Sequence, residues 1–376
     1  MRKKLVQIVL LCCFATGSVL AQKANESVMS FIGVGDMMLG THFPSESYLP
    51  PDDDPWPLLK ETASVLNTGD VVFGNLEGAF LDKGVVFKHC KDATKCYAFK
   101  TPVRYAPVLK KAGFNVLNIA NNHIRDFGPA GLASTKKALT DLDIPFAGLI
   151  DKPCDTLRVN GKLIGLCGFS PNTGTVKIGD IPNAQSIVRA LKETCDFVIV
   201  SFHGGAEGKK HQHVTRKDEI FYGENRGNVY EFAHAVIDAG ADVVFGHGPH
   251  VTRSVEVYRD RFIAYSLGNF CTYSRFSLTG ANKLTPVIQV WTNDKGEFVR
   301  GQIHAFHQVK GAGTFPDPEK RVIYKIKDLT YYDFPEMRDQ LVIDDNGEMF
   351  VPFRWKMTPK NIELPEVIIN TNPISK

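Results

Sequence analysis

Several short apolar runs in this sequence end in side chains that bind divalent metals or phosphate oxygens. The residues that follow these runs are Asp36, Asn75, Glu77, Asn121, Asn122, His123, His203, His247, His250 and Asn269. A short apolar run bounded by turn formers is typical of a strand buried on both faces. Because ligands bind at the carboxyl ends of such strands in open α/β sheets, we expect these side chains to meet at one sheet edge. The pattern predicts a metal site.

The candidate ligands are carboxylates, carboxamides and imidazoles, without sulfur. Such a set favours Zn, Mn, Fe or Ni. Glu77 can bridge two cations, so we expect two divalent ions, and Asp70 is an alternative bridging carboxylate. Single residues have other interpretations: Asp36 alone is typical of a helix N-cap, and Asn121 to His123 alone are typical of a turn.

His123 and Asp126 are the candidate catalytic residues. An imidazole that lies beside a metal ligand without binding the metal can protonate a leaving oxygen. Asp126 follows three residues later and can accept the other ring hydrogen, which fixes the tautomer. Arg125 and Arg253 can hold an anion, although a surface ion pair is the more frequent role of an arginine.

The elements that position these residues alternate between strand-like and helix-like segments, which predicts βαβ units and an α/β fold. We expect strands over 30–35, 71–74, 116–119, 146–147, 163–169, 197–201 and 243–246. We expect helices over 56–68, 104–114, 129–143, 184–195 and 228–240. Hairpins over 156–169, 255–268 and 286–306 make the sheets mixed, and the first contains an Asn160-Gly161 turn. The pattern weakens after about residue 310, so we divide the chain into a domain over 28–309 and a C-terminal extension over 310–376.

Residues 1–21 have the features of a secretory signal: a basic MRKK start, an apolar stretch and small residues before Ala21. An uncleaved membrane anchor is the alternative. Export predicts a periplasmic or cell-surface location. The chain has 44 basic and 41 acidic residues, and Arg2, Lys3 and Lys4 lie in the signal. The rest is balanced at 41 to 41, so we expect no nucleic-acid partner.

The cysteine spacing indicates disulfides rather than a metal site. Cys90 and Cys96 bracket a polar loop and can close a small disulfide in an exported protein. The pairing of Cys154, Cys167, Cys195 and Cys271 stays open. No CxxC spacing occurs, so a thiolate zinc site is not expected.

The motifs GDMMLG, FGNLEG, ANNHIRDFG, HGGAE, GHGPHV and SLGNF, in this order, resemble the CapA family of bacterial capsule (poly-γ-glutamate) synthesis proteins. That family belongs to the calcineurin-like metallophosphoesterase superfamily. The resemblance implies a four-layer α/β/β/α sandwich with two metals at the strand ends. It implies that His123 is a general acid or anion clamp. It assigns one metal to Asp36 and His250, the second to Asn122, His203 and His247, and the bridging position to Glu77.

Two departures from the family pattern concern the site. Met38 stands where the superfamily often has histidine, and Gly204 and Gly208 replace a common Trp and Tyr. An insertion-like stretch over 209–228 follows. The resemblance implies an exported two-metal hydrolase that acts on a phosphoester or related anionic bond, with capsule and cell-envelope machinery as partners. Two alternatives are a γ-glutamyl polymer amide hydrolase or transferase, and a non-catalytic assembly factor that binds an anionic polymer.

Overall fold

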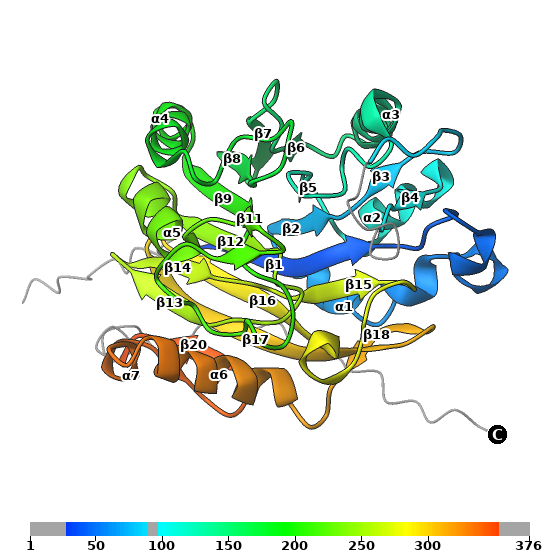
Figure 1. Cartoon of the computed structure of the whole chain (residues 1–376). Coiled ribbons are helices and arrows are strands. Elements are labelled where there is room, and N and C mark those ends of the chain that lie inside the picture. The colour runs from blue at the N-terminus through cyan, green and yellow to red at the C-terminus, as the bar shows by residue number, and fades with distance from the viewer. Residues whose placement is uncertain (1–27, 89–96, 353–376) are drawn as a thin grey trace, which may run out of the picture.

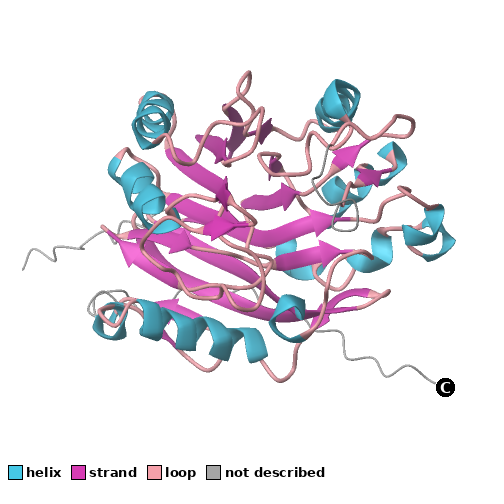
Figure 2. Ribbon diagram, in the orientation of Figure 1, coloured by secondary structure: helices cyan, strands magenta, loops and turns pink. Residues whose placement is uncertain are grey.

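Two mixed β-sheets with helices outside them form the body of this protein (Figures 1 and 2). The structure is a computed structural model, and it describes residues 28–88 and 97–352. The predicted signal over 1–21, the Cys90–Cys96 disulfide and the end of the predicted extension therefore lie outside the described residues. Within the described ranges, no helix combines the length and apolar character that crossing a membrane requires.

Among the described residues, the larger sheet has ten strands, and β1, β2, β5 and the edge strand β6 run parallel to one another. Strands β16 and β17 continue the sheet in antiparallel fashion. Strand β15 pairs in parallel with the C-terminal end of β1, from Asp36 onward. Its strands are β1 (Met29–Met38), β2 (Val71–Leu76), β5 (Val116–Asn118), β6 (Phe146–Ala147), β15 (Asn269–Thr272), β16 (Leu284–Thr292), β17 (Phe298–Val309), β18 (Gly313–Pro316), β19 (Val342–Ile343) and β20 (Glu348–Phe350).

The smaller sheet has six strands, with a parallel centre and an antiparallel strand at each edge. Its strands, in sheet order, are β13 (Val255–Tyr258), β14 (Arg261–Ala264), β12 (Val243–His247), β9 (Phe197–His203), β8 (Lys162–Phe169) and β7 (Cys154–Val159). Two further two-stranded ladders join β3 (Ala79–Phe80) to β4 (Lys100–Thr101) and β10 (Ile220–Phe221) to β11 (Glu224–Asn225).

The two sheets pack face to face through one hydrophobic core. Phe73 of the larger sheet stacks on Phe245 of the smaller one, with ring centroids 5.5 Å apart. Because successive side chains of a strand point to opposite faces, Ile32 and Val72 belong to a second core on the other side of the larger sheet. The apolar runs of the sequence are therefore strands covered on both faces, as predicted.

Helices cover the outer faces of this pair of sheets. Helices α4 and α5 pack against the smaller sheet, and the second core buries α1, α2 and α3 against the larger one. Helix α6 runs below β16 and β17 (Figure 1). The helices are α1 (Ala63–Leu66), α2 (Pro107–Ala112), α3 (Gly128–Asp141), α4 (Ile181–Lys192), α5 (Val229–Asp238), α6 (Arg321–Asp333) and α7 (Met337–Gln340). The predicted α/β class with mixed sheets is confirmed.

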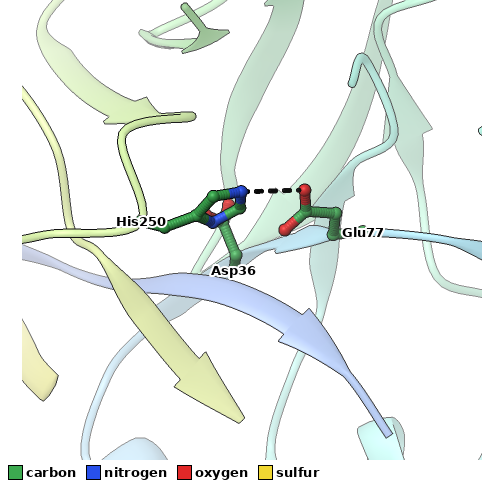
Figure 3. Close-up of side chains that lie close together, drawn as sticks. All are labelled: Asp36, Glu77 and His250. Carbon is green, nitrogen blue, oxygen red and sulfur yellow. Dashed lines mark ion pairs between the residues drawn. The ribbon is translucent and has the colours of Figure 1, made fainter. Parts of the chain in front are cut away.

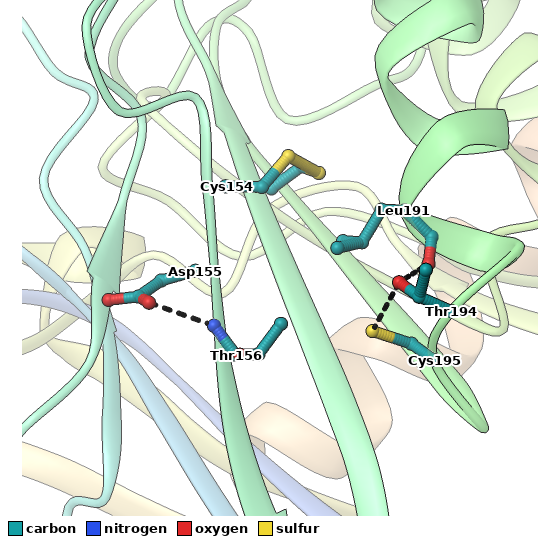
Figure 4. Close-up of a disulfide and its surroundings, with 7 residues drawn as sticks. Cys154, Asp155, Thr156, Leu191, Thr194 and Cys195 are labelled. Carbon is teal, nitrogen blue, oxygen red and sulfur yellow. Dashed lines mark hydrogen bonds between the residues drawn. A yellow bond between two sulfur atoms is a disulfide. The ribbon is translucent and has the colours of Figure 1, made fainter.

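A disulfide joins Cys154 on edge strand β7 to Cys167 on β8 (Figure 4). The two cysteines are direct partners in the antiparallel register of these strands, which places their side chains on the same face. Cys195, also drawn in Figure 4, and Cys271 are free and buried. The structure thus provides one pairing that the sequence left open.

Candidate metal centre

The adjacent strands β1 and β2 bring Asp36 and Glu77 together at their C-terminal ends. Asp36 lies opposite Asn75 in the β1–β2 register, and the Glu77 backbone N–H donates to the Met37 carbonyl at 2.9 Å. Both carboxylates are fully buried. A Cβ atom on Gly35 would stand 2.1 Å from the Gly268 carbonyl oxygen, so only glycine allows the close approach that places Asp36.

His250 reaches this pair from the smaller sheet. It ends a turn after β12 in the left-handed conformation, with φ of 55°. Its Nδ1 lies 2.9 Å from Asp36 Oδ2, and its Nε2 lies 3.5 Å from Glu77 Oε1, so the ring lies between two carboxylates (Figure 3). One donor atom from each of the three residues lies within 4.8 Å of the others, which is close enough to share a metal ion.

The three groups perturb one another electrostatically. Burial alone would lower the pKa of His250, but the negative charges of Glu77 and Asp36 outweigh it and raise the pKa to about 10. Burial would raise the pKa of Asp36, but the hydrogen bond and charge of His250 lower it. Burial raises the pKa of Glu77 well above its usual value. The site therefore favours a positive charge between two carboxyl groups.

His203 approaches Asp36 from the end of β9. Its Nδ1 lies 3.9 Å from Asp36 Oδ1 and 3.4 Å from Asn75 Nδ2, which also donates to Asp36 at 2.7 Å. Burial lowers the pKa of His203 well below its usual value. The imidazole is therefore neutral at physiological pH, which is the form that binds metals.

His123 and Asp126 form a buried pair beside Glu77. His123 Nδ1 lies 2.7 Å from Asp126 Oδ2, and His123 Nε2 lies 3.8 Å from Glu77 Oε1. Lys88 Nζ, which the sequence analysis did not single out, lies 3.0 Å from Asp126 Oδ1. Burial and the charge of Lys88 lower the pKa of His123. The neutral ring donates its Nδ1 hydrogen to Asp126 and turns its Nε2 toward the centre.

His247 is the last residue of β12 and lies opposite His203 in the β9–β12 register. Its Nε2 is 2.9 Å from the Val34 carbonyl oxygen, and its Nδ1 is 3.5 Å from Ser201 Oγ. The Nε2–H thus donates to the Val34 carbonyl, which leaves Nδ1 as the nitrogen that could bind a metal. Met38 is buried, and its sulfur accepts the Gly40 backbone N–H at 3.3 Å.

Four buried atoms of three candidate ligands have no hydrogen-bond partner among the described residues. They are both carboxylate oxygens of Glu77, Asn122 Oδ1 and His203 Nε2. Buried polar atoms are normally hydrogen-bonded, because leaving them unpaired is costly. Oxygen and nitrogen donors of this kind suit a divalent transition metal. The residues that are present fit such an ion.

A cavity of about 590 Å³ opens beside these residues, and Asn122, His123 and His250 line it. Side chains from the loop over 204–228 line another part of the cavity, among them Glu207 and Arg226. A substrate in this cavity can contact the candidate ligands and this loop at the same time. Sequence reasoning missed Arg226, for which the only signal was its place in the insertion-like stretch.

Fold and site together define a mixed α/β protein with a buried set of potential metal ligands at its strand ends. The sequence model of the family described as "Bacterial capsule synthesis protein PGA_cap" matches residues 30–274. The chain belongs to this family, which confirms the CapA resemblance.

Curated relatives carry names from capsule and polymer synthesis. "Capsule biosynthesis protein CapA" of Bacillus anthracis is 30% identical over 284 residues, which cover 70% of this chain and 64% of the relative. "PGA biosynthesis protein CapA" of Bacillus subtilis is 31% identical over 262 residues, covering 65% of this chain and 64% of the relative. A "Probable polyglutamine synthesis accessory protein" of Mycobacterium tuberculosis is 28% identical over 254 residues, covering 58% and 60%. This chain thus spans 64% of the length of the two Bacillus relatives.

Two solved structures show weaker similarity. A hypothetical protein from Thermus thermophilus has a TM-score of 0.45 and 15% identity, over 75% of this chain and 100% of that chain. A putative 5'-nucleotidase from Staphylococcus aureus has a TM-score of 0.40 and 15% identity, over 84% of this chain and 59% of that chain.

Proposed function

We propose that this protein is an exported, metal-dependent hydrolase of capsule metabolism that acts on a phosphoester or related anionic bond. The observation that carries the proposal is the convergence of Asp36, Glu77 and His250, whose donor atoms lie within 4.8 Å of one another. Buried atoms of Glu77, Asn122 and His203 lack hydrogen bonds among the described residues, and a large cavity lies beside the site. These residues would hold two divalent ions chosen from Zn, Mn, Fe and Ni. His247 would bind through Nδ1 while its Nε2–H stays on the Val34 carbonyl, an arrangement that is common for metal-ligating histidines.

Divalent ions in this site would supply Lewis acidity and lower the pKa of a water molecule near an anionic substrate. A side chain of the protein would donate the proton to the leaving oxygen. Asp126 holds the Nδ1 hydrogen of His123, so Nε2 is the nitrogen that exchanges a proton with the substrate. Lys88 Nζ lies 3.0 Å from the second oxygen of Asp126 and helps to orient that carboxylate.

Export and a role at the cell envelope are part of the proposal. The Cys154–Cys167 disulfide supports an oxidising compartment, because structural disulfides are rare in the cytosol. The names of the CapA relatives support a capsule polymer as substrate or product, and capsule machinery as partner. Fractionation of the native host, with the disulfide state measured by thiol alkylation, tests the compartment. Recovery only in the cytosol with free thiols would contradict it.

Elemental analysis of the purified protein tests the metal centre. We expect one or two transition-metal ions per chain, and their loss in the double variant Asp36→Ala with His250→Ala. The matched control is Asp151→Ala with His307→Ala, which also removes one carboxylate and one imidazole, but outside the site. Full metal content in the first double variant would overturn the assignment.

A non-catalytic role is the second candidate, and the accessory-protein name of the Mycobacterium tuberculosis relative favours it. In that case the metals would be structural and the cavity would bind an anionic polymer. Turnover of an aryl phosphate that chelation and His123→Ala abolish supports the hydrolase. Polymer binding that survives His123→Ala, without turnover, supports the assembly factor. Release of glutamate from a γ-glutamyl polymer, with no phosphatase activity, would instead indicate the amide hydrolase.

A further inference from the structure

We infer that Arg226 forms an anion-binding subsite in the cavity, which receives a second anionic group of the substrate, a carboxylate or a phosphate. The inference rests on the proposed function and deepens it. His123 and His250 line the same cavity as Arg226, so one substrate can reach both the candidate metal centre and this arginine. The substrate class is then a molecule with two separate anionic groups.

The guanidinium of Arg226 is buried and incompletely paired. The residue is only 6% exposed, and its Nη2 donates to Glu207 Oε1 at 3.0 Å. Its Nε lies 3.3 Å from Glu224 Oε2, but that side chain is 64% exposed, so the ion pair is weak. Neither Nε nor Nη1 makes a hydrogen bond within the described parts of the chain. Because a guanidinium has five donors and unpaired buried donors are costly, an anion is the missing partner.

Arg226 is held rigidly relative to the metal centre. Its carbonyl accepts from the Gly205 backbone, two residues after His203, and its own N–H donates to the Glu219 carbonyl at 2.8 Å. The Glu219 carboxylate is fixed by two 2.7 Å hydrogen bonds from the fully buried Arg253. A preorganised arginine loses little entropy on binding, which suits recognition of a planar or tetrahedral anion.

Arg275 places a second guanidinium on the lining of the same cavity. Its Nε is buried and without a hydrogen bond among the described residues. Its charged group lies 5.2 Å from the ring centre of Tyr48 and 5.0 Å from that of Tyr97, which positions it without neutralising it. Lys88 also lines the cavity, and its Nζ lies 3.0 Å from Asp126 Oδ1. Arg226 Nε and Nη1 and Arg275 Nε make no hydrogen bond among the described residues, so both arginines still have donors for an anion.

Calorimetric titration of the full chain, as purified and after chelation, tests the subsite directly. The probes are glutarate and inorganic phosphate, with pentane-1,5-diol as the uncharged control. We expect Arg226→Gln to weaken binding of the preferred anion about tenfold, as expected for loss of a charged hydrogen bond. Arg226→Lys should restore part of it. Arg189→Gln, on the exposed face of α4, is the matched control and should bind as the wild type does.

The response to the two probes distinguishes the sources of the anion: tighter binding of glutarate indicates a carboxylate, and tighter binding of phosphate indicates a phosphate. Absence of anion binding to the wild type would overturn the inference. So would binding that His250→Ala abolishes and Arg226→Gln leaves unchanged, because the anion would then lie at the metal centre. Thermal melts of Arg226→Gln and Arg226→Lys show whether a loss of anion binding reflects unfolding. If Arg226→Gln does not fold, anion binding by Arg226→Lys decides: partial binding supports the subsite, and unchanged binding overturns it.

A kinetic comparison separates this inference from the proposed hydrolase. The ratio of kcat/KM for 4-carboxyphenyl phosphate to kcat/KM for phenyl phosphate should fall about tenfold in Arg226→Gln. Turnover with an unchanged ratio would confirm the hydrolase and overturn the subsite. If neither ester is hydrolysed, the hydrolase fails, while the glutarate and phosphate titrations still decide whether Arg226 binds an anion.

Discussion

His250 Nδ1 lies 2.9 Å from Asp36 Oδ2, and the other nitrogen of the same ring lies 3.5 Å from Glu77 Oε1. In the metal-free protein the protonated imidazole therefore supplies the positive charge that two buried carboxyl groups need. A metal ion bound by these three residues would take over that task and require the neutral imidazole. One histidine thus couples stability, protonation and metal binding.

Replacing His250 by alanine should destabilise the metal-free protein. The change leaves Asp36 without its counter-charge in a buried place, which costs about 3 kcal/mol of the free energy of unfolding. Urea unfolding in the presence of a chelator measures the loss. His307→Ala, half-buried on β17, is the control and should cost much less. Equal losses in both variants would contradict the charge-balancing role.

Metal affinity should rise with pH. The pKa of His250 is raised to about 10, so the metal-free site holds this proton at neutral pH, and metal binding must release it. Each pH unit should therefore increase the apparent affinity by up to about tenfold. Competition with a chromophoric chelator between about pH 6 and pH 8 measures this slope. Calorimetry in two buffers of different ionisation enthalpy counts the released protons, and a pH-independent affinity without proton release would refute the coupling.

Asp126→Asn should lower kcat with little change in KM. The amide can no longer fix the Nδ1 hydrogen of His123, which lies 2.7 Å from Asp126 Oδ2. Loss of such an orienting partner typically costs about 10- to 100-fold in activity. Steady-state kinetics on an aryl phosphate with the metal-loaded protein measure it, and metal content should not change. Asp141→Asn, exposed at the end of α3, is the control. A loss confined to KM would instead give Asp126 a role in substrate binding.

The buried strands were the most predictable part of the fold. The predicted strand over 163–169 is β8 (Lys162–Phe169), and the one over 243–246 is β12 (Val243–His247). These runs are fully enclosed between layers, so their apolar pattern alone identifies them. The helix expected over 56–68 is much shorter: only Ala63–Leu66 is α-helical, because prolines at 55 and 57 begin a 3-10 turn instead.

Long-range pairing could not be predicted from the local pattern. Strand β20 pairs with β17, and the paired residues, such as Arg300 and Phe350, are far apart in the sequence. The region after residue 310 thus adds β18, β19 and β20 to the larger sheet, a contribution that its many charged residues concealed. The position of α6 below this sheet is equally a matter of tertiary contacts (Figure 1).

The residues of the candidate site that lie at strand ends could be predicted from the sequence. Asp36, Glu77 and His250 lie together because the carboxyl ends of β1, β2 and β12 meet between the sheets. His247 is still part of β12 and donates its Nε2–H to the Val34 carbonyl, whereas His250 lies in the left-handed turn after this strand. Lys88 and Arg226 come from loops, whose sequences carry no periodic signal.

His304 should make the stability of this protein decrease in mild acid. It lies on β17, and its Nε2 is 3.3 Å from Gln289 Oε1 on β16. Burial lowers its pKa from 6.5 to about 4. Because the unfolded chain binds this proton more readily, the contribution to stability is complete above pH 6.5 and is lost as the pH falls toward 4. The total loss is about 3 kcal/mol of the free energy of unfolding.

Other buried histidines add losses of their own, so His304→Gln must be compared with the wild type by urea unfolding across this range. The difference between the two proteins should be constant above pH 6.5 and shift by about 3 kcal/mol in favour of the variant near pH 4. A difference that does not change with pH would show that His304 is protonated equally well in the folded and unfolded chains.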